Sequence, residues 1–195
     1  MAMGRPREFD ADAALDSAMR VFWQRGYEGA ALSDLTEAMG INRPSMYAAF
    51  GNKEELFLKA FARYADTTAA YVSKALDEPT ARQVAETILA GAVEATTYKD
   101  CPHGCLSVQG ALATSADGEP VRQRLADWRV DGEKAIRSRL QAAKAEGDLP
   151  ADADPGDLAR FLCTVMYGIA VEAAGGTAKA KLKRTAAMAM QAWPT

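Results

Sequence analysis

The reactive side chains of the chain are concentrated in Cys101-Pro102-His103-Gly104-Cys105-Leu106, which holds two of the three cysteines and the only histidine. This segment begins a predicted helix, and a helix N-terminus favours the thiolate form of a nearby cysteine. Cys105 is therefore a candidate redox or electrophile sensor with Cys101 as its resolving partner. A second interpretation makes Cys101, His103 and Cys105, together with Cys163, the ligands of a soft or borderline metal ion.

A structural interpretation competes with both, in which Cys105 is a small buried residue and Cys101 an exposed, inert one. The Cys-x-His-x-Cys spacing is tighter than that of common zinc sites, so we expect no bound metal. A thiol catalyst would need an orienting carboxylate, and none stands out, so we expect no enzymatic activity. No motif indicates a cofactor.

An apolar effector pocket between helices is the more ordinary place for a ligand, since small-molecule sites are mostly apolar with a few polar groups. No residue pattern identifies the ligand, and each aromatic candidate also suits a packed core. The candidate sensing or lining residues are Cys101, His103, Cys105, Tyr64, Tyr71, Tyr98, Val108, Leu112, Trp128, Phe161 and Tyr167.

A second group of polar side chains follows the pattern of a helix-turn-helix. The turn at residues 40–42 joins two short predicted helices, Ser33–Met39, with Ser33 as its cap, and Arg43–Ala49, capped by Asn42. The second helix of such a motif lies in the DNA major groove and contacts base edges from its N-terminal half. Its outward side chains are Arg43, Pro44, Ser45, Tyr47 and Ala48.

The remaining predicted helices position these groups. Asp10 caps a first helix whose apolar stripe ends at Gly26, and Asn52 begins a capping box that opens a long helix to about Leu76. Five further helices are expected at Thr80–Tyr98, Gly104–Thr114, Glu119–Glu146, Asp154–Ala174 and Thr177–Trp193. We therefore predict an all-α fold of about nine helices, with a three-helix DNA-binding domain at residues 1–51 and a C-terminal domain at residues 52–195.

Composition narrows the class of protein. The net charge is −3, and residues 1–64 carry eight basic and nine acidic side chains, so DNA binding would depend on where the basic residues lie rather than on bulk charge. No apolar run approaches the roughly 20 residues that span a bilayer, and the N-terminus lacks the apolar core of a signal peptide. Three cysteines without such a signal favour a cytoplasmic location.

Three motifs together resemble the N-terminal region of the TetR family over about residues 8–60. They are Phe22-x-x-x-Gly26-Tyr27-x-x-Ala30, Gly40-Ile41-Asn42-x-x-x-Met46-Tyr47-x-x-Phe50 and Asn52-Lys53-Glu54-Glu55-Leu56. The resemblance implies nine or ten helices, dimerisation through the last two helices and an effector cavity in the C-terminal domain. It also implies phosphate contacts for Tyr47 and Lys53.

Physical chemistry agrees with that implied role, because a helix N-terminus with a lysine is an anion site. Ser33 is a candidate phosphate contact and Arg43 the best candidate base reader, since arginine bonds guanine in bidentate fashion. Family members often carry a polar or aromatic residue where Ala48 and Ala49 stand, which implies fewer direct base contacts here. The expected DNA-binding residues are Arg5, Arg7, Ser33, Asn42, Arg43, Pro44, Ser45, Tyr47, Ala48 and Lys53.

Apolar faces on the last two predicted helices indicate a homodimer with a four-helix interface. The expected interface residues are Leu158, Phe161, Leu162, Val165, Ile169, Ala173, Ala186, Met190 and Trp193. Such a dimer would place two DNA-binding heads about one helical turn apart, which matches a palindromic operator.

The sequence thus predicts a ligand-responsive regulator that binds double-stranded DNA, and repression is the commoner behaviour of the family it resembles. An effector of unidentified structure would tilt the long fourth helix and change the spacing of the heads. The alternatives are a thiol-based sensor and a helical adaptor that does not bind DNA.

Overall fold

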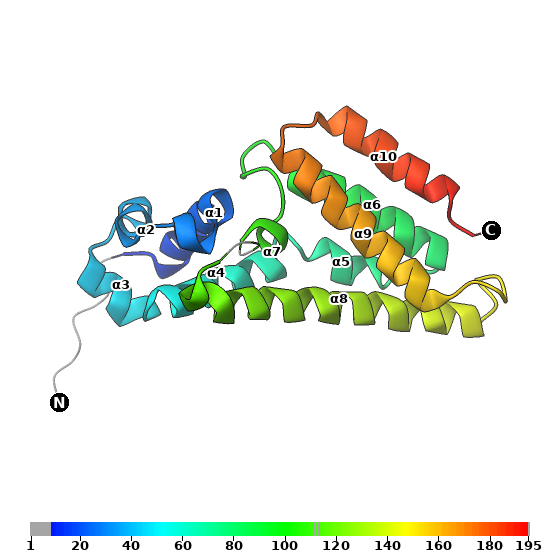
Figure 1. The fold of residues 1–195 in the computed structure, drawn as a ribbon, viewed down its shortest axis with the longest axis horizontal. Helices are drawn as coiled ribbons and strands as arrows, with labels where there is room; N and C mark the ends of the chain where they lie inside the picture. The colour runs from blue at the N-terminus through cyan, green and yellow to red at the C-terminus, as the bar shows by residue number, and fades with distance from the viewer. Residues whose placement is uncertain (1–8, 111, 113, 195) are drawn as a thin grey trace.

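The computed structural model describes residues 9–110, 112 and 114–194, and every regular element in these residues is helical, which confirms the predicted all-α fold. Figure 1 shows the N-terminal helices at one end, α6, α9 and α10 at the other, and α8 running along one side between them. The α-helices are α1 (Ala11–Gly29), α2 (Leu32–Met39), α3 (Arg43–Phe50), α4 (Lys53–Asp66), α5 (Tyr71–Ala75), α6 (Ala81–Thr96), α7 (Leu106–Gln109), α8 (Glu119–Ala145), α9 (Pro155–Ala174) and α10 (Lys179–Gln191). A 3₁₀ turn, η1 (Ala116–Gly118), precedes α8.

Side-chain caps start most of the N-terminal helices where the sequence predicts them. The carboxylate of Asp10 accepts the N–H groups of Asp12 and Ala13, and the Asn42 side chain accepts the N–H of Ser45 at 2.9 Å. Asn52 and Glu55 form the predicted reciprocal capping box, with bonds of 2.8 and 2.9 Å. These caps satisfy backbone donors that a helix leaves free in its first turn, and so fix where α1, α3 and α4 begin.

The cap of α2 differs from the prediction. Ser33 lies inside the first turn, and Ala31 is the capping position. The carboxylate of Asp34 accepts the N–H of Ala31 at 3.2 Å and also pairs with Arg25 of α1. A carboxylate in the first turn suits the helix dipole and binds back to the preceding backbone, so Asp34 takes the role that the sequence pattern gave to Ser33.

The long helix predicted to run to about Leu76 is two helices, α4 and α5, separated by a turn at residues 67–70. The Thr67 hydroxyl donates to the Arg63 carbonyl at 2.6 Å, a local bond that competes with a regular helical continuation. Beyond the turn, the Tyr71 ring packs so closely over Gly91 of α6 that a Cβ there would lie 2.4 Å from it. Packing of α5 on α6 therefore decides the break.

The helix predicted at Gly104–Thr114 is also shorter, since α7 extends only from Leu106 to Gln109. The carbonyl of Gly110 accepts the N–H of Tyr27 at 2.8 Å instead of continuing the α7 ladder. The short α7 is therefore bonded to α1 at its C-terminal end and also to α8, because Arg129 of α8 donates to the Ser107 carbonyl. A contact with α1, far away in the sequence, thus ends this helix.

Two clusters of buried side chains make up the core. One joins the N-terminal helices to α4, α7 and the start of α8. Two of its aromatic pairs pack edge to face, with ring centroids 5.0 Å apart for Phe22 and Phe57 and 4.9 Å for Trp23 and Tyr64. The other lies between α6, α8, α9 and α10. The N-terminal head, α1 to α3, therefore shares its core with the first helices of the C-terminal part.

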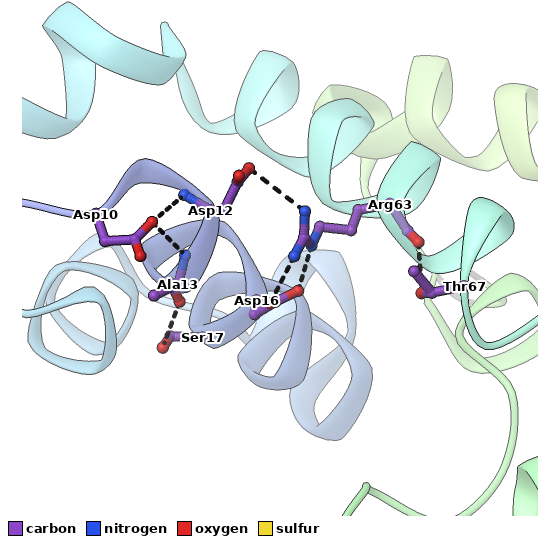
Figure 2. A network of polar contacts seen from close by, with 7 residues as sticks. All are labelled: Asp10, Asp12, Ala13, Asp16, Ser17, Arg63 and Thr67. Atoms are coloured by element: carbon purple, nitrogen blue, oxygen red, sulfur yellow. Dashed lines mark hydrogen bonds and ion pairs between the residues drawn. The ribbon is translucent and has the colours of Figure 1, made fainter.

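A polar network on the surface ties α1 to α4. The Arg63 guanidinium reaches from α4 to the Asp16 carboxylate, with a second bond to Asp16 at 2.8 Å and one to Asp12 at 3.3 Å (Figure 2). This bidentate geometry fixes the direction in which α4 leaves the head.

None of the helices in the described ranges is long and apolar enough to cross a membrane.

The capping box at Asn52 should contribute measurably to stability. We expect Asn52→Ala to lower the free energy of unfolding by about 1 kcal/mol, because it leaves the N–H of Glu55 without its partner. Urea denaturation followed by circular dichroism measures the change. Asn52→Asp is the matched control and should retain the cap; equal stability of the alanine variant and the wild type would contradict the role of the box.

Candidate DNA-binding surface and effector cavity

The helix α3 presents one polar face to solvent. Met46 and Phe50 anchor it in the core, while Arg43, Tyr47 and Ala48 are exposed, Tyr47 by 47% of its surface. A large aromatic side chain that is half exposed on a short helix leaves much of its surface available to a partner. Asn42 and Pro44 are exposed at the start of the same helix, and Ser45 is half-buried beside them.

Lys53 occupies the first position of α4, next to the capping box, and is half-buried. Its ammonium lies 4.6 Å from the centroid of the Tyr27 ring. Partial burial lowers the pKa of Lys53, and the neighbouring Glu28 carboxylate opposes that shift. Ser33 is exposed in the first turn of α2, while the expected Arg5 and Arg7 lie outside the described residues.

A small interior cavity lies between α4, α5, α6, α7, α8 and α9. Its volume is about 20 Å³, enough for one water molecule. Five of the predicted residues meet at it, namely Tyr64, Tyr71, Cys105, Trp128 and Tyr167. Sequence reasoning did not include the other lining residues, which are Ala69, Val72, Thr96, Ser107, Met166 and Ala170.

One of the missed residues, Thr96, carried a signal in the sequence. Thr96 and Ser107 are the fully buried polar residues of the described chain. Thr96 continues the apolar stripe of α6 through Ile88 and Ala92 at four-residue spacing, and a polar residue on such a stripe points into the core. Its hydroxyl donates to the Ala92 carbonyl at 2.7 Å.

Cys105 is the centre of the polar groups in this cavity. Its sulfur accepts the Tyr64 hydroxyl at 3.2 Å and lies 3.0 Å from the Ser107 hydroxyl. Burial raises the pKa of Tyr64 well above its ordinary value, and the proximity of Cys105 adds to the shift. Burial likewise raises the pKa of Tyr71 and Tyr167, so the phenols that face the cavity are neutral hydrogen-bond donors at neutral pH.

The other candidate sensing residues lie apart from the cavity. Cys101 and Tyr98 line an open surface groove, His103 is exposed, and Leu112 is exposed by 65%. The remaining two are Val108, which is buried, and Phe161, which is half-buried against the second core cluster. In the part of the chain that the structure describes, no three His, Cys, Asp or Glu side chains are placed to hold a metal ion.

The cavity is connected to the head through the described residues of the segment 105–118, which are 105–110, 112 and 114–118. Gly26 has a φ of +69°, which breaks the helical geometry of α1 at the predicted residue and directs the Tyr27 N–H to the Gly110 carbonyl. One residue further, the Glu28 carboxylate accepts both the N–H and the hydroxyl of Ser115, at 3.0 and 2.7 Å. The same segment therefore contacts the cavity at one end and the head at the other.

Comparison with known proteins identifies this arrangement. A sequence profile described as bacterial regulatory proteins of the tetR family matches residues 14–60, and one described as a tetracyclin repressor-like C-terminal domain matches residues 83–191. The chain belongs to the TetR family. The family assignment made from the three sequence motifs is thereby confirmed, and the helix-turn-helix is that of a transcriptional regulator.

Individual TetR-family members resemble the chain over nearly its whole length. It is 35% identical to the HTH-type transcriptional repressor ComR of Escherichia coli K12 over 193 residues, covering 98% of this chain and 92% of ComR. The HTH-type transcriptional repressor BdcR of the same organism is 29% identical, with 98% and 93% covered. A cysteine-substituted variant of the TetR family regulator CifR, solved with double-strand operator DNA, superposes with a TM-score of 0.93 at 43% identity, covering 97% of this chain and 100% of CifR.

The expected dimerisation residues of this TetR-family chain divide into two groups. Leu162, Ile169, Ala173 and Trp193 are buried within the chain itself. Leu158, Phe161, Val165, Ala186 and Met190 are only half-buried, and the neighbouring Val171 and Met188 are more than half exposed. The second group leaves an apolar surface on α9 and α10 uncovered.

The thiol environments predict different reactivities at neutral pH. Burial raises the pKa of Cys163 to about 11, so its reactive thiolate is scarce at neutral pH and becomes more abundant as the pH rises. We expect iodoacetamide to label Cys163 more slowly than the half-exposed Cys101 at about pH 7.5, with the rate at Cys163 rising more than tenfold by about pH 9.5. Peptide mass spectrometry measures both rates. Urea-unfolded protein, in which the three cysteines should react alike, is the control, and equal native rates at pH 7.5 would contradict the prediction.

Proposed function

We propose that the chain is a transcriptional repressor that binds a palindromic operator as a homodimer and leaves it when an effector enters the cavity at Cys105. The observation that carries the proposal is the exposed polar face of α3, set between a turn and the lysine at the start of α4. The relatives ComR and BdcR are repressors, and the CifR structure contains operator DNA, which supports the same activity here.

In this proposal α3 lies in the major groove. Arg43 reads a guanine edge, Ala48 contacts at most a thymine methyl, and Tyr47 bonds a phosphate. Lys53 at the start of α4 forms a second phosphate site, and Ser33 adds a contact from α2. The lack of large polar groups at positions 48 and 49 leaves Arg43 as the principal base reader.

The homodimer would form through the uncovered apolar surface of α9 and α10. A helix pair from each subunit gives a four-helix interface, and its two-fold axis relates the two heads to the two halves of a palindrome. The boundary between the head and the rest is placed at residues 51 and 52, where the chain enters α4. Such a regulator acts in the cytoplasm and has no enzymatic activity.

Effector release follows from the position of the cavity. A ligand larger than one water must displace Tyr64, Tyr71 or the 105–118 segment to enter, because the cavity is otherwise filled. Displacement of that segment strains its bonds to Tyr27 and Glu28 and shifts the head relative to α4. A difference in ligand affinity between the two arrangements equivalent to about 1–3 kcal/mol is enough for regulation.

A covalent effector at Cys105 is a second candidate that the cavity size favours. Adding a small group to a thiol needs no preformed pocket, and the sulfur is already in contact with two hydroxyl groups. A thiol-reactive molecule would enlarge the Cys105 side chain between α4 and α7. The helical adaptor without DNA binding leaves the exposed α3 face unexplained.

The DNA-binding residues can be separated by the type of contact they make. Arg43→Ala should weaken operator binding by about 1–3 kcal/mol and relax specificity at one base pair, whereas Tyr47→Ala should weaken all duplexes alike. Fluorescence anisotropy with a duplex enriched from a random-sequence library by the wild-type protein, and with single-base variants of it, measures both. Lys74→Gln on α5 is the charge-matched control, and unchanged affinity in both α3 variants would favour the adaptor.

The thiol candidate is tested by alkylation. N-ethylmaleimide treatment of the wild-type dimer should weaken binding to the same duplex at least tenfold, because the adduct cannot fit a cavity of about 20 Å³. Cys105→Ser should bind DNA normally and resist the reagent, while Cys101→Ser should respond like the wild type. If alkylated Cys105 leaves DNA affinity unchanged, the thiol is structural and the noncovalent effector remains.

A further inference from the structure

The side chain of Lys53 is held in place by the head before any DNA is present. Its ammonium lies 4.6 Å from the centroid of the Tyr27 ring, within the range of a cation–π contact. The ring itself is part of the core, since Tyr27 is 8% exposed and packs edge to face on Phe57 with centroids 5.4 Å apart. A lysine at a helix start normally samples many rotamers in water, and the contact with this ring favours one of them.

The neighbouring Glu28 adds a charge to this arrangement. Its carboxylate attracts Lys53, but both hydrogen bonds that Glu28 makes go to Ser115. These bonds hold the pKa of Glu28 below its ordinary value and keep its carboxylate next to Ser115. Lys53 is therefore guided by Glu28 without being captured in an ion pair.

Both neighbours of Lys53 are fixed by the C-terminal part of the chain. The backbone N–H of Tyr27 donates to Gly110 at 2.8 Å, and Glu28 is bound to Ser115. We infer that Tyr27 and Glu28 are positioning residues that direct Lys53 toward a DNA phosphate, and that the 105–118 segment sets their position. This inference rests on the proposed DNA contact of Lys53.

Preorganisation is the physical basis of the effect. A phosphate contact made by an already ordered lysine loses less side-chain entropy on binding than one made by a free lysine. Loss of the Gly110 and Ser115 contacts would leave the Tyr27 ring less well placed and free the Glu28 carboxylate to pair with Lys53. Either change weakens the contact between Lys53 and a DNA phosphate, while the base-reading face of α3 stays intact.

The test is a double-mutant cycle between Tyr27 and Lys53. DNA affinity is measured by anisotropy over a salt series, using the duplex enriched by the wild-type protein. Tyr27→Phe keeps the ring and should bind within about twofold of the wild type, whereas Tyr27→Leu should bind about fivefold more weakly. In a Lys53→Gln background, Tyr27→Leu should add less than about twofold, because it acts through the lysine.

The cycle separates the failure of this inference from that of the proposed function. Loss of one phosphate contact should reduce the slope of log K against log salt concentration by about 0.9. If Lys53→Gln changes neither the affinity nor this slope, the proposed phosphate contact is wrong, and so is the inference. If Lys53→Gln weakens binding but Tyr27→Leu adds its full loss independently, the positioning role alone is overturned. Ser115→Ala should weaken binding about threefold only when Lys53 is present, and no effect would overturn the role of the segment.

A spectroscopic measurement covers the case in which Tyr27→Leu does not fold. The lysines are reductively methylated with ¹³C, which preserves their charge, and the Lys53 signal is assigned by its loss in Lys53→Gln. A methyl group over an aromatic ring is shifted upfield, so the Lys53 resonance should lie upfield of the other lysines in the wild type and in Tyr27→Phe. An unshifted Lys53 resonance would overturn the inference.

Discussion

The hydrogen bond from the Tyr27 N–H to the Gly110 carbonyl links the head to the C-terminal part of the chain, and it exists because of Gly26. With a φ of +69°, Gly26 interrupts α1 and turns the next N–H out of the helical ladder. A side chain at this position would add a backbone cost of about 1–3 kcal/mol. Its Cβ would also lie 3.5 Å from the carbonyl oxygens of Gln109 and Gly110, so the two segments are already in van der Waals contact.

The segment that accepts this bond is also part of the cavity. Cys105 and Ser107 line the cavity. Arg129 of α8 donates a hydrogen bond to the Ser107 carbonyl, and the Ser115 hydroxyl donates one to the Glu28 carboxylate. Because α7 is a single turn of helix in contact with both α8 and α1, we expect a displacement at the cavity to reach α1. The head is thus tied to the C-terminal part covalently through α4 and noncovalently through residues 105–110 and 114–118, through the bond from Arg20 to the Asp100 carbonyl and through the packing of Val121 and Leu125 in the first core cluster.

Local chemistry explains which features could be predicted from the sequence. The caps at Asp10, Asn42 and Asn52 and the break at Gly26 depend on residues only a few positions apart, and the structure has them where the sequence predicts them. The family could be predicted because the helix-turn-helix is itself a local motif. The DNA contacts assigned to Arg43, Tyr47 and Lys53 remain predictions.

Long-range contacts explain the rest. The break between α4 and α5 depends on the approach of Tyr71 to Gly91, and the short α7 depends on the bond from Tyr27 to Gly110. Neither pairing leaves a periodic pattern in the sequence. For the same reason only some of the aromatic candidates line the cavity, whereas Tyr98 and Leu112 are on the surface.

Amide hydrogen exchange tests most directly whether the 105–118 segment holds the head in its DNA-binding arrangement. If it does, linkage requires that DNA binding stabilise these contacts in return. Exchange of the Tyr27 and Ser115 amides should slow when the enriched duplex is bound, while the Asp148 amide, hydrogen-bonded in the turn after α8 at 2.9 Å, should change little. Unchanged exchange at Tyr27 and Ser115 in the complex would contradict the account, because the DNA-binding arrangement would then not depend on these contacts.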